Sequence, residues 1–265
     1  MPWQVVLKTT YTVIGIFVMS LFLPVNVTLH TLQGIILQRF FERKGWCIFM
    51  QITIREPGSA ITHFIAMMMT IFAAVPLLVK TGIRSGSQNF TAMCIFVGSM
   101  ILLYGASATY HSVDLSGRSL RIFRKIDHMM IFVLIAGSYT PICLIVLGGQ
   151  LGYTMLAVVW GIAVAGMLIK ALWITCPKWF SSVIYIAMGW VCVFAFGQLY
   201  TTLPHAAFLW LLVGGIIYTV GGVIYALKLP IFNAKHKDFG SHEVFHLFVM
   251  AGSLCHFIFM YLYVA

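Results

Sequence analysis

The chain has 265 residues, of which 61% are hydrophobic and only 8% are charged, and its formal net charge is +10. Soluble domains carry about 25% charged residues, so this composition excludes an ordinary water-exposed globular protein. The basic residues lie in short stretches between long apolar runs, where they set membrane orientation. This distribution argues against a nucleic-acid-binding surface.

The first 50 residues form an N-terminal extension that three interpretations fit. Residues 11–29 are apolar enough to span a bilayer but contain Pro24 and Asn26. The segment is an extra helix, a signal peptide with Lys8 as its basic region, or a stretch upstream of a true start at Met50. We expect an extra hydrophobic helix without a functional role, and N-terminal protein sequencing distinguishes the three.

Residues 51–265 contain seven apolar segments, each close to the length of about 20 residues that crosses the hydrocarbon core. We therefore predict an all-α polytopic membrane protein, a seven-transmembrane helix bundle. The predicted spans cover residues 60–79, 90–110, 126–147, 152–173, 179–200, 206–227 and 243–263.

The loops between these spans differ in charge. Basic residues gather before the first, third, fifth and seventh spans, whereas the opposite side carries only Lys80 and Arg84. The positive-inside rule then places the basic loops in the cytoplasm and the C-terminus outside. The six cysteines form no C-x-x-C pair, so neither a disulfide framework nor a zinc ribbon is expected.

Ionisable residues are costly inside a membrane, and several of them converge here on the cytoplasmic ends of three spans. His242 and His246, at the start of the seventh span, share one helix face about 6 Å apart. His111 ends the second span at the same predicted depth. Three histidines and a water form the open coordination of catalytic zinc, so we predict a metal site with these three ligands.

Two further residues lie at this depth. Asp127 begins the third span and is predicted to orient the water or act as a base. Ser107 lies one turn from His111 and is predicted to donate a hydrogen bond to a substrate carbonyl or oxyanion. Taken alone, such a serine is more often a small helix-packing residue.

Other polar features have simpler interpretations. His256 lies about 21 Å along the helix from His242, too far to share an ion, and is expected to be a packing residue. His63, which follows Glu56 near the start of the first span, is a candidate supporting residue. The proline in segment 137–141 predicts a kink with satisfied backbone groups, which would also shape a cavity above the metal.

At these positions the chain resembles the hemolysin III family, a branch of the progestin and adiponectin receptor superfamily. The residues that carry the resemblance, over about 50–265, are Glu56-Pro-Gly-Ser-Ala-Ile-Thr-His63, Ser107-x-x-x-His111, Asp127, Gly-Ser-Tyr-Thr-Pro and Ser241-His242-Glu-Val-Phe-His246. The family pattern usually has Asn where this chain has Ser59, which weakens any role carried over to that position. The first 50 residues have no counterpart in the short bacterial members, so nothing transfers to them.

The resemblance implies a seven-helix bundle in a bacterial plasma membrane, with a cytoplasmic N-terminus. It also implies zinc held by His111, His242 and His246, with Asp127 at the zinc-bound water and Ser107 beside it. Related ceramidase-like enzymes in the superfamily suggest hydrolysis of a lipid amide.

Three functions remain open at this point. The first is a zinc-dependent hydrolase that acts on the amide bond of a membrane lipid. The second is an intramembrane metalloprotease, because His242-Glu243-x-x-His246 matches H-E-x-x-H with Glu243 as the general base. The third is a non-enzymatic receptor or membrane-homeostasis protein in which the zinc is structural. The sequence identifies no protein partner and no particular lipid.

Overall fold

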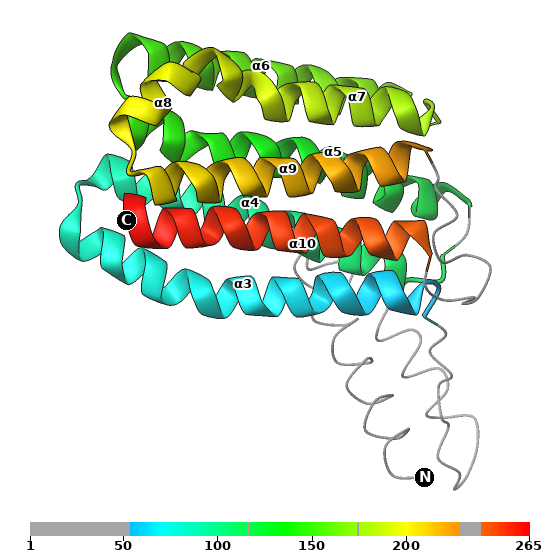
Figure 1. The fold of residues 1–265 in the computed structure, drawn as a ribbon. Coiled ribbons are helices and arrows are strands. Elements are labelled where there is room, and N and C mark those ends of the chain that lie inside the picture. The colour runs from blue at the N-terminus through cyan, green and yellow to red at the C-terminus, as the bar shows by residue number, and fades with distance from the viewer. Residues whose placement is uncertain (1–53, 116, 174, 228–239) are drawn as a thin grey trace, which may run out of the picture.

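A computed structural model describes residues 54–115, 117–173, 175–227 and 240–265 (Figure 1). The predicted apolar segment 11–29 and the basic residues Lys228, Lys235 and Lys237 lie outside this part of the chain. Within it, seven helical segments are long and apolar enough to cross a membrane: Pro57–Arg84, Ser87–Ser112, Gly117–Leu147, Gly149–Leu172, Trp179–Thr202, His205–Leu227 and Ser241–Val264. The predicted all-α bundle of seven spans is confirmed.

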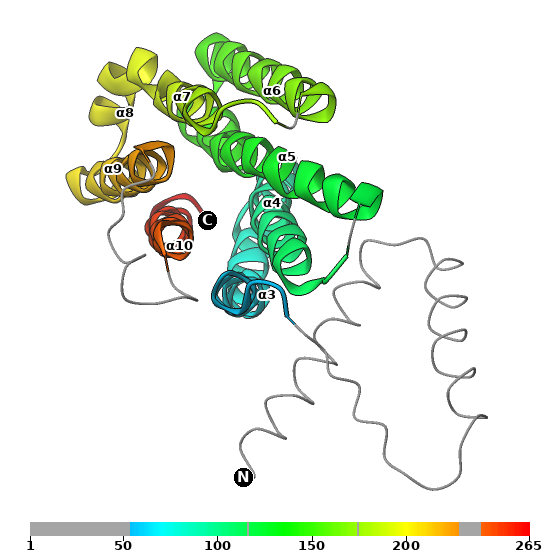
Figure 2. The same ribbon diagram turned by 90° about the vertical axis from the view of Figure 1, so that its right-hand side faces the viewer.

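The helices follow one another around the bundle in chain order, and the last packs against the first (Figure 2). Short loops join most neighbours, so consecutive helices run antiparallel. The α-helices are α3 (Pro57–Arg84), α4 (Ser87–Ser112), α5 (Gly117–Pro141), α6 (Gly149–Leu172), α7 (Lys178–Gly189), α8 (Phe196–Thr202), α9 (His205–Leu227) and α10 (Ser241–Phe259).

One end of the bundle gathers the starts of α3, α5, α7 and α10 with the ends of α4, α6 and α9 (Figure 1). We call it the histidine end, because His111 and His242 lie there. Helix α5 begins nine residues before the predicted third span and includes Arg118, Arg121 and Arg124. The first turns of α5, which carry these arginines, extend the helix beyond its apolar part. Hydropathy alone does not detect such a polar extension.

Three spans depart from regular α-helix, and in the seventh the departure is a π-helix over Met260–Val264 that follows α10. Pro141 ends α5, and a π-helix over Ile142–Leu147 continues the same span. The fifth span, expected as one helix, is interrupted between α7 and α8 by a 3₁₀-helix over Trp190–Ala195. The Tyr139 hydroxyl donates to the carbonyl of Gly189 at 2.6 Å and accepts from the amide of Cys192 at 2.9 Å, which satisfies backbone groups at this interruption.

Small residues allow close helix contacts, as is usual in membrane bundles. A Cβ built on Gly137 would lie 2.2 Å from Ser99 Oγ, and one built on Gly166 would lie 2.2 Å from the ring of Phe132. Because of these two glycines, α5 can pack closely against both α4 and α6.

A buried hydroxyl network links three helices at mid-bundle. Tyr104 of α4 donates to Ser253 of α10 at 2.7 Å, and the hydroxyl of Tyr218 from α9 lies 2.7 Å from the same serine oxygen. Such polar groups need protein partners where lipid offers none. The network therefore fixes the register of α10 against α4 and α9.

Candidate metal centre

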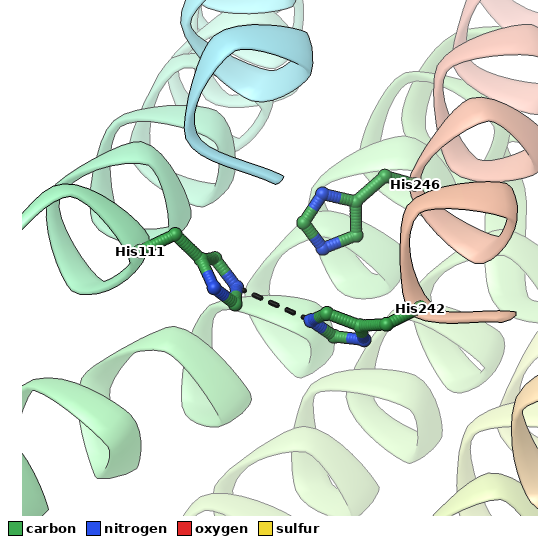
Figure 3. A group of neighbouring side chains, drawn as sticks. All are labelled: His111, His242 and His246. Atoms are coloured by element: carbon green, nitrogen blue, oxygen red, sulfur yellow. Dashed lines mark hydrogen bonds between the residues drawn. The ribbon is translucent and has the colours of Figure 1, made fainter. Parts of the chain in front are cut away.

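Three histidines meet at the histidine end of the bundle (Figure 3). His111 comes from the last turn of α4, and His242 and His246 come from the first two turns of α10. Each offers one ring nitrogen, and these nitrogens all lie within 4.8 Å of one another. We call these residues the histidine cluster. The structure brings them together as the sequence predicts, whereas their binding of zinc stays a prediction.

The spacing of one pair of rings fits a tetrahedral zinc. The Nε2 atoms of His111 and His242 are 3.3 Å apart. Zinc–nitrogen bonds of about 2.0–2.1 Å at tetrahedral angles place two ligand nitrogens about 3.3 Å apart. The three rings are tilted by 53–70° to one another, so they face a shared space and do not stack. The donor set is therefore suited to a small divalent cation that accepts imidazole.

Glu56 holds His111 in position. The Nδ1 of His111 donates to Glu56 Oε2 at 2.5 Å, and the Glu56 amide donates to the carbonyl of His111 at 3.0 Å. The hydrogen bond from His111, aided by the nearby charges of His111 and Arg55, brings the pKa of Glu56 to about 2 although burial opposes this. Carboxylates in this position fix the tautomer and leave Nε2 for the metal.

Sequence reasoning placed Glu56 near His63 but missed this contact. The available signal was an acidic side chain next to Pro57, immediately before a membrane helix whose start lies at the depth of the predicted ligands.

His246 is positioned from α3. The hydroxyl of Thr62 lies 3.5 Å from its Nδ1, and the ring of His63 stacks on it with centroids 3.6 Å apart and planes 6° apart. Both ring nitrogens of His63 are buried without a hydrogen-bond partner in the described residues. His63 therefore contacts a predicted ligand through its ring face, and its supporting role remains a prediction.

Asp127 and Ser107 line the same cavity as His242 and His246, which encloses about 170 Å³. Both side chains are buried, and Asp127 Oδ2 lies 3.6 Å from Nδ1 of His128. The remaining wall is mainly apolar and includes Leu103, Ile131, Leu134, Ile135, Ser138, Tyr139, Ile142, Val249 and His256. Residues of the predicted kink thus form part of the cavity, as expected.

His256 lies away from the cluster, on the face of α10 that meets α9. Its Nε2 is 3.3 Å from the carbonyl of Leu211, and a Cβ on Gly214 would lie 2.5 Å from its ring. The packing role predicted for His256 agrees with these contacts.

Glu243, between the two α10 histidines, is occupied by local contacts. Its Oε2 accepts the Gly240 amide at 2.8 Å and caps α10, while its Oε1 accepts the hydroxyl of Ser59 at 2.5 Å. Ser59, which stands where the family pattern usually has Asn, therefore joins α3 to the start of α10. These bonds give the carboxylate a structural role at the helix start.

Comparison with known proteins identifies relatives across most of the chain. The family model "Haemolysin-III related" matches residues 51–257. The "Hemolysin-3 homolog" of Bacillus subtilis (strain 168) is 36% identical over 206 residues, which cover 77% of this chain and 92% of that protein. The "Hemolysin-3" of Bacillus cereus is 36% identical over 215 residues, 81% of this chain and 94% of that protein. A more distant relative, the "Adiponectin receptor protein" of Drosophila melanogaster, is 24% identical over 229 residues, which cover 76% of this chain and 49% of that protein.

Proposed function

The chain belongs to the haemolysin-III-related family, and on that premise we propose that it is an integral membrane zinc protein that hydrolyses lipid amides. One observation carries the proposal: His242 and His246 of the histidine cluster line an apolar cavity whose wall also contains Asp127 and Ser107. A purely structural site would require neither the cavity nor a buried carboxylate beside it.

The ligands of the proposed zinc are His111, His242 and His246. When bound, zinc supplies a Lewis acid that polarises a carbonyl and lowers the pKa of water to about 7. Asp127 is the proton acceptor in this proposal, and the Ser107 hydroxyl donates a hydrogen bond to the amide carbonyl oxygen. The apolar wall holds the acyl chain and excludes bulk water.

We further propose that the histidine end faces the cytoplasm of a bacterial cell and that the C-terminus lies outside. Arg118, Arg121, Arg124 and Lys125 lie at the histidine end on α5, whereas Arg84 ends α3 at the opposite end. The positive-inside rule supports this orientation. The proposed domain limits are an N-terminal extension over 1–50 and the seven-span unit over 51–265.

The test uses purified full-length protein in lipid nanodiscs, with its metal content measured by mass spectrometry. Ceramides and other N-acyl lipids are offered, and the released fatty acid is quantified. We expect release by the zinc-loaded protein, and a loss of about 10²-fold or more in Asp127→Asn with zinc retained. His242→Ala should lose both zinc and activity. Zinc-loaded protein that hydrolyses none of these lipids would overturn the proposal.

Two alternatives give different outcomes in the same experiment. A receptor or homeostasis protein with structural zinc would melt earlier after chelation yet hydrolyse nothing. An intramembrane protease would depend on Glu243, so Glu243→Gln would abolish its activity. The hydrogen bonds of Glu243 to Ser59 and Gly240 disfavour that role, and we expect Glu243→Gln to retain lipid hydrolysis.

A further inference from the structure

A second cluster of reactive side chains lies at the histidine end, where α6 passes into α7. Lys170 Nζ donates to Cys176 Sγ at 3.1 Å and to Ser181 Oγ at 2.5 Å, and the sulfur and the hydroxyl are 3.2 Å apart. All three residues are buried and line the cavity described above. The proposed hydrolysis uses none of them.

The charge of Lys170 needs a counter-ion. Lys170 is only 3% exposed, and among the described residues no carboxylate lies within ion-pair distance of its ammonium group. A buried ammonium without a partner is strongly disfavoured. Among the described groups that Lys170 contacts, the sulfur of Cys176 is the one that can carry a negative charge at neutral pH.

The surroundings of Cys176 favour its ionised form. Burial raises the pKa of this thiol, but hydrogen bonds with Ser181 and Lys170, together with the charges of Lys170 and Arg124, bring the pKa below its usual value. The titratable groups that share the cavity wall with it on the packed helices include Lys170 from α6, Arg124, Asp127 and His128 from α5, Tyr185 from α7 and Tyr225 from α9. Lys125 of α5 also lies nearby, because it donates to the carbonyl of Ala171, next to Lys170.

The other described cysteines lack this arrangement. Cys94, Cys143, Cys192 and Cys255 lie within membrane spans, and no lysine hydrogen bond to any of them is found in the described residues. Cys192 is the useful comparison, because it lines the same cavity.

A neighbouring hydroxyl indicates that the cavity accepts a polar group here. Ser182 is 2% exposed, lines the cavity, and its Oγ has no hydrogen-bond partner within the described part of the chain. Buried hydroxyls are seldom left unpaired, so a carbonyl oxygen that enters the cavity would accept the hydrogen bond of Ser182.

We propose that Cys176 is a thiolate nucleophile, paired with Lys170, that adds to α,β-unsaturated carbonyl compounds entering the cavity from the membrane. The sulfur forms a bond to the β-carbon, and the electrons of the C=C bond move to the carbonyl oxygen to give an enolate. Lys170 Nζ supplies the proton that converts the enolate to the saturated carbonyl, and solvent reprotonates the amine. Ser182 donates a hydrogen bond to that oxygen, and the apolar wall accepts the hydrocarbon tail.

This inference does not depend on zinc or on lipid hydrolysis, so it is tested separately. Full-length protein in nanodiscs is treated with N-ethylmaleimide or 2-nonenal over a range of pH, and the adduct at each cysteine is quantified by peptide mass spectrometry. Cys192 serves as the internal control in the same cavity. We expect Cys176 to react at least tenfold faster than Cys192 at neutral pH, with an apparent pKa below the free-thiol value of about 8.5.

Variants of Lys170 test the ion pair. Lys170→Met should slow the Cys176 reaction at least tenfold at neutral pH and raise its apparent pKa, whereas Lys170→Arg should preserve most of the rate. Removing zinc with a chelator should leave the rate unchanged. A Cys176 rate that follows the free-thiol pKa, or that is the same in a folded Lys170→Met protein, would overturn the proposal.

A spectroscopic measurement covers the case in which access or folding obscures the rates. The S–H stretching band is compared between the wild type and Cys176→Ser by Raman difference spectroscopy at neutral pH. We expect no S–H band from Cys176, because its sulfur is ionised. An S–H band that disappears only in Cys176→Ser contradicts the thiolate, whatever the reaction rates are.

Discussion

Replacing Glu56 by Gln removes the charge that orients His111 and should weaken zinc binding. Loss of such an outer partner lowers metal affinity by about 10–100-fold. The Glu56 side chain is 40% exposed, so water can replace part of its interaction with the ring. We therefore expect the lower end of that range, about tenfold, which corresponds to about 1.4 kcal/mol.

The pH dependence of this effect follows from the direction of the pKa shift. The pKa of Glu56 falls from 4.5 to about 2 with His111 as its partner, so the interaction is present above pH 4.5 and is lost as the pH falls toward 2. Between about pH 7.5 and 8.5, where unperturbed histidines are largely neutral, the carboxylate stays ionised. The ratio of wild-type to Glu56→Gln affinity should therefore be constant across that interval.

The assay is zinc competition against a chelator of known affinity, with purified protein in detergent. Asp114→Asn is the matched control, because this exposed carboxylate lies three residues after His111. We expect its zinc affinity to equal that of the wild type. Equal affinities for wild type and Glu56→Gln, or an equal loss in Asp114→Asn, would refute the role given to Glu56.

Three further substitutions test the packing that supports the site. His63→Ala should weaken zinc binding about fivefold, because it removes the ring stacked on His246, a contact worth about 1 kcal/mol. His63→Phe keeps a stacked ring and should bind zinc as the wild type does; chelator competition measures both affinities. Gly166→Ala should destabilise the protein by about 1–3 kcal/mol because its Cβ would overlap an aromatic ring of α5, whereas Gly161→Ala meets open space and should leave the thermal melt unchanged. Tyr139→Phe should cost about 1–3 kcal/mol in the same melt, because the Gly189 carbonyl and the Cys192 amide lose their partner inside a membrane span, where lipid offers none.

The histidine cluster was predictable from the sequence because its geometry is mostly local. The i,i+4 spacing puts His242 and His246 on one face of α10 whatever the rest of the fold does. Counting apolar segments places His111 and Asp127 at the same end, since alternate loops meet at one surface. Depth is therefore readable from hydropathy alone.

Contacts made by irregular backbone were not predictable in the same way. Glu56 precedes α3 and Cys176 lies between α6 and α7, where no periodicity relates a residue to its neighbours. The interruption after Gly189 is similar: segment 179–200 is apolar and contains no proline, and the contact that satisfies its backbone comes from Tyr139 on another helix. Tertiary partners decide such features, so single-sequence patterns miss them.

The register of α4 against α10 explains how ligands from two helices meet in one place. Tyr104 lies seven residues before His111, and Ser253 lies seven residues after His246. Because the helices are antiparallel, the step from Tyr104 to His111 and the step from Ser253 to His246 both run about 10.5 Å toward the histidine end. Seven residues make nearly two full turns, so each step returns to nearly the same helix face. The hydrogen bond from Tyr104 to Ser253 therefore sets the register two turns away from the histidine cluster, and the ring centroids of His111 and His246 lie 5.2 Å apart where that register predicts. A slip of one residue would rotate the rings of one helix by about 100° and separate the three histidines, so the buried hydroxyl network at mid-bundle holds the helices in the arrangement that the histidine cluster requires.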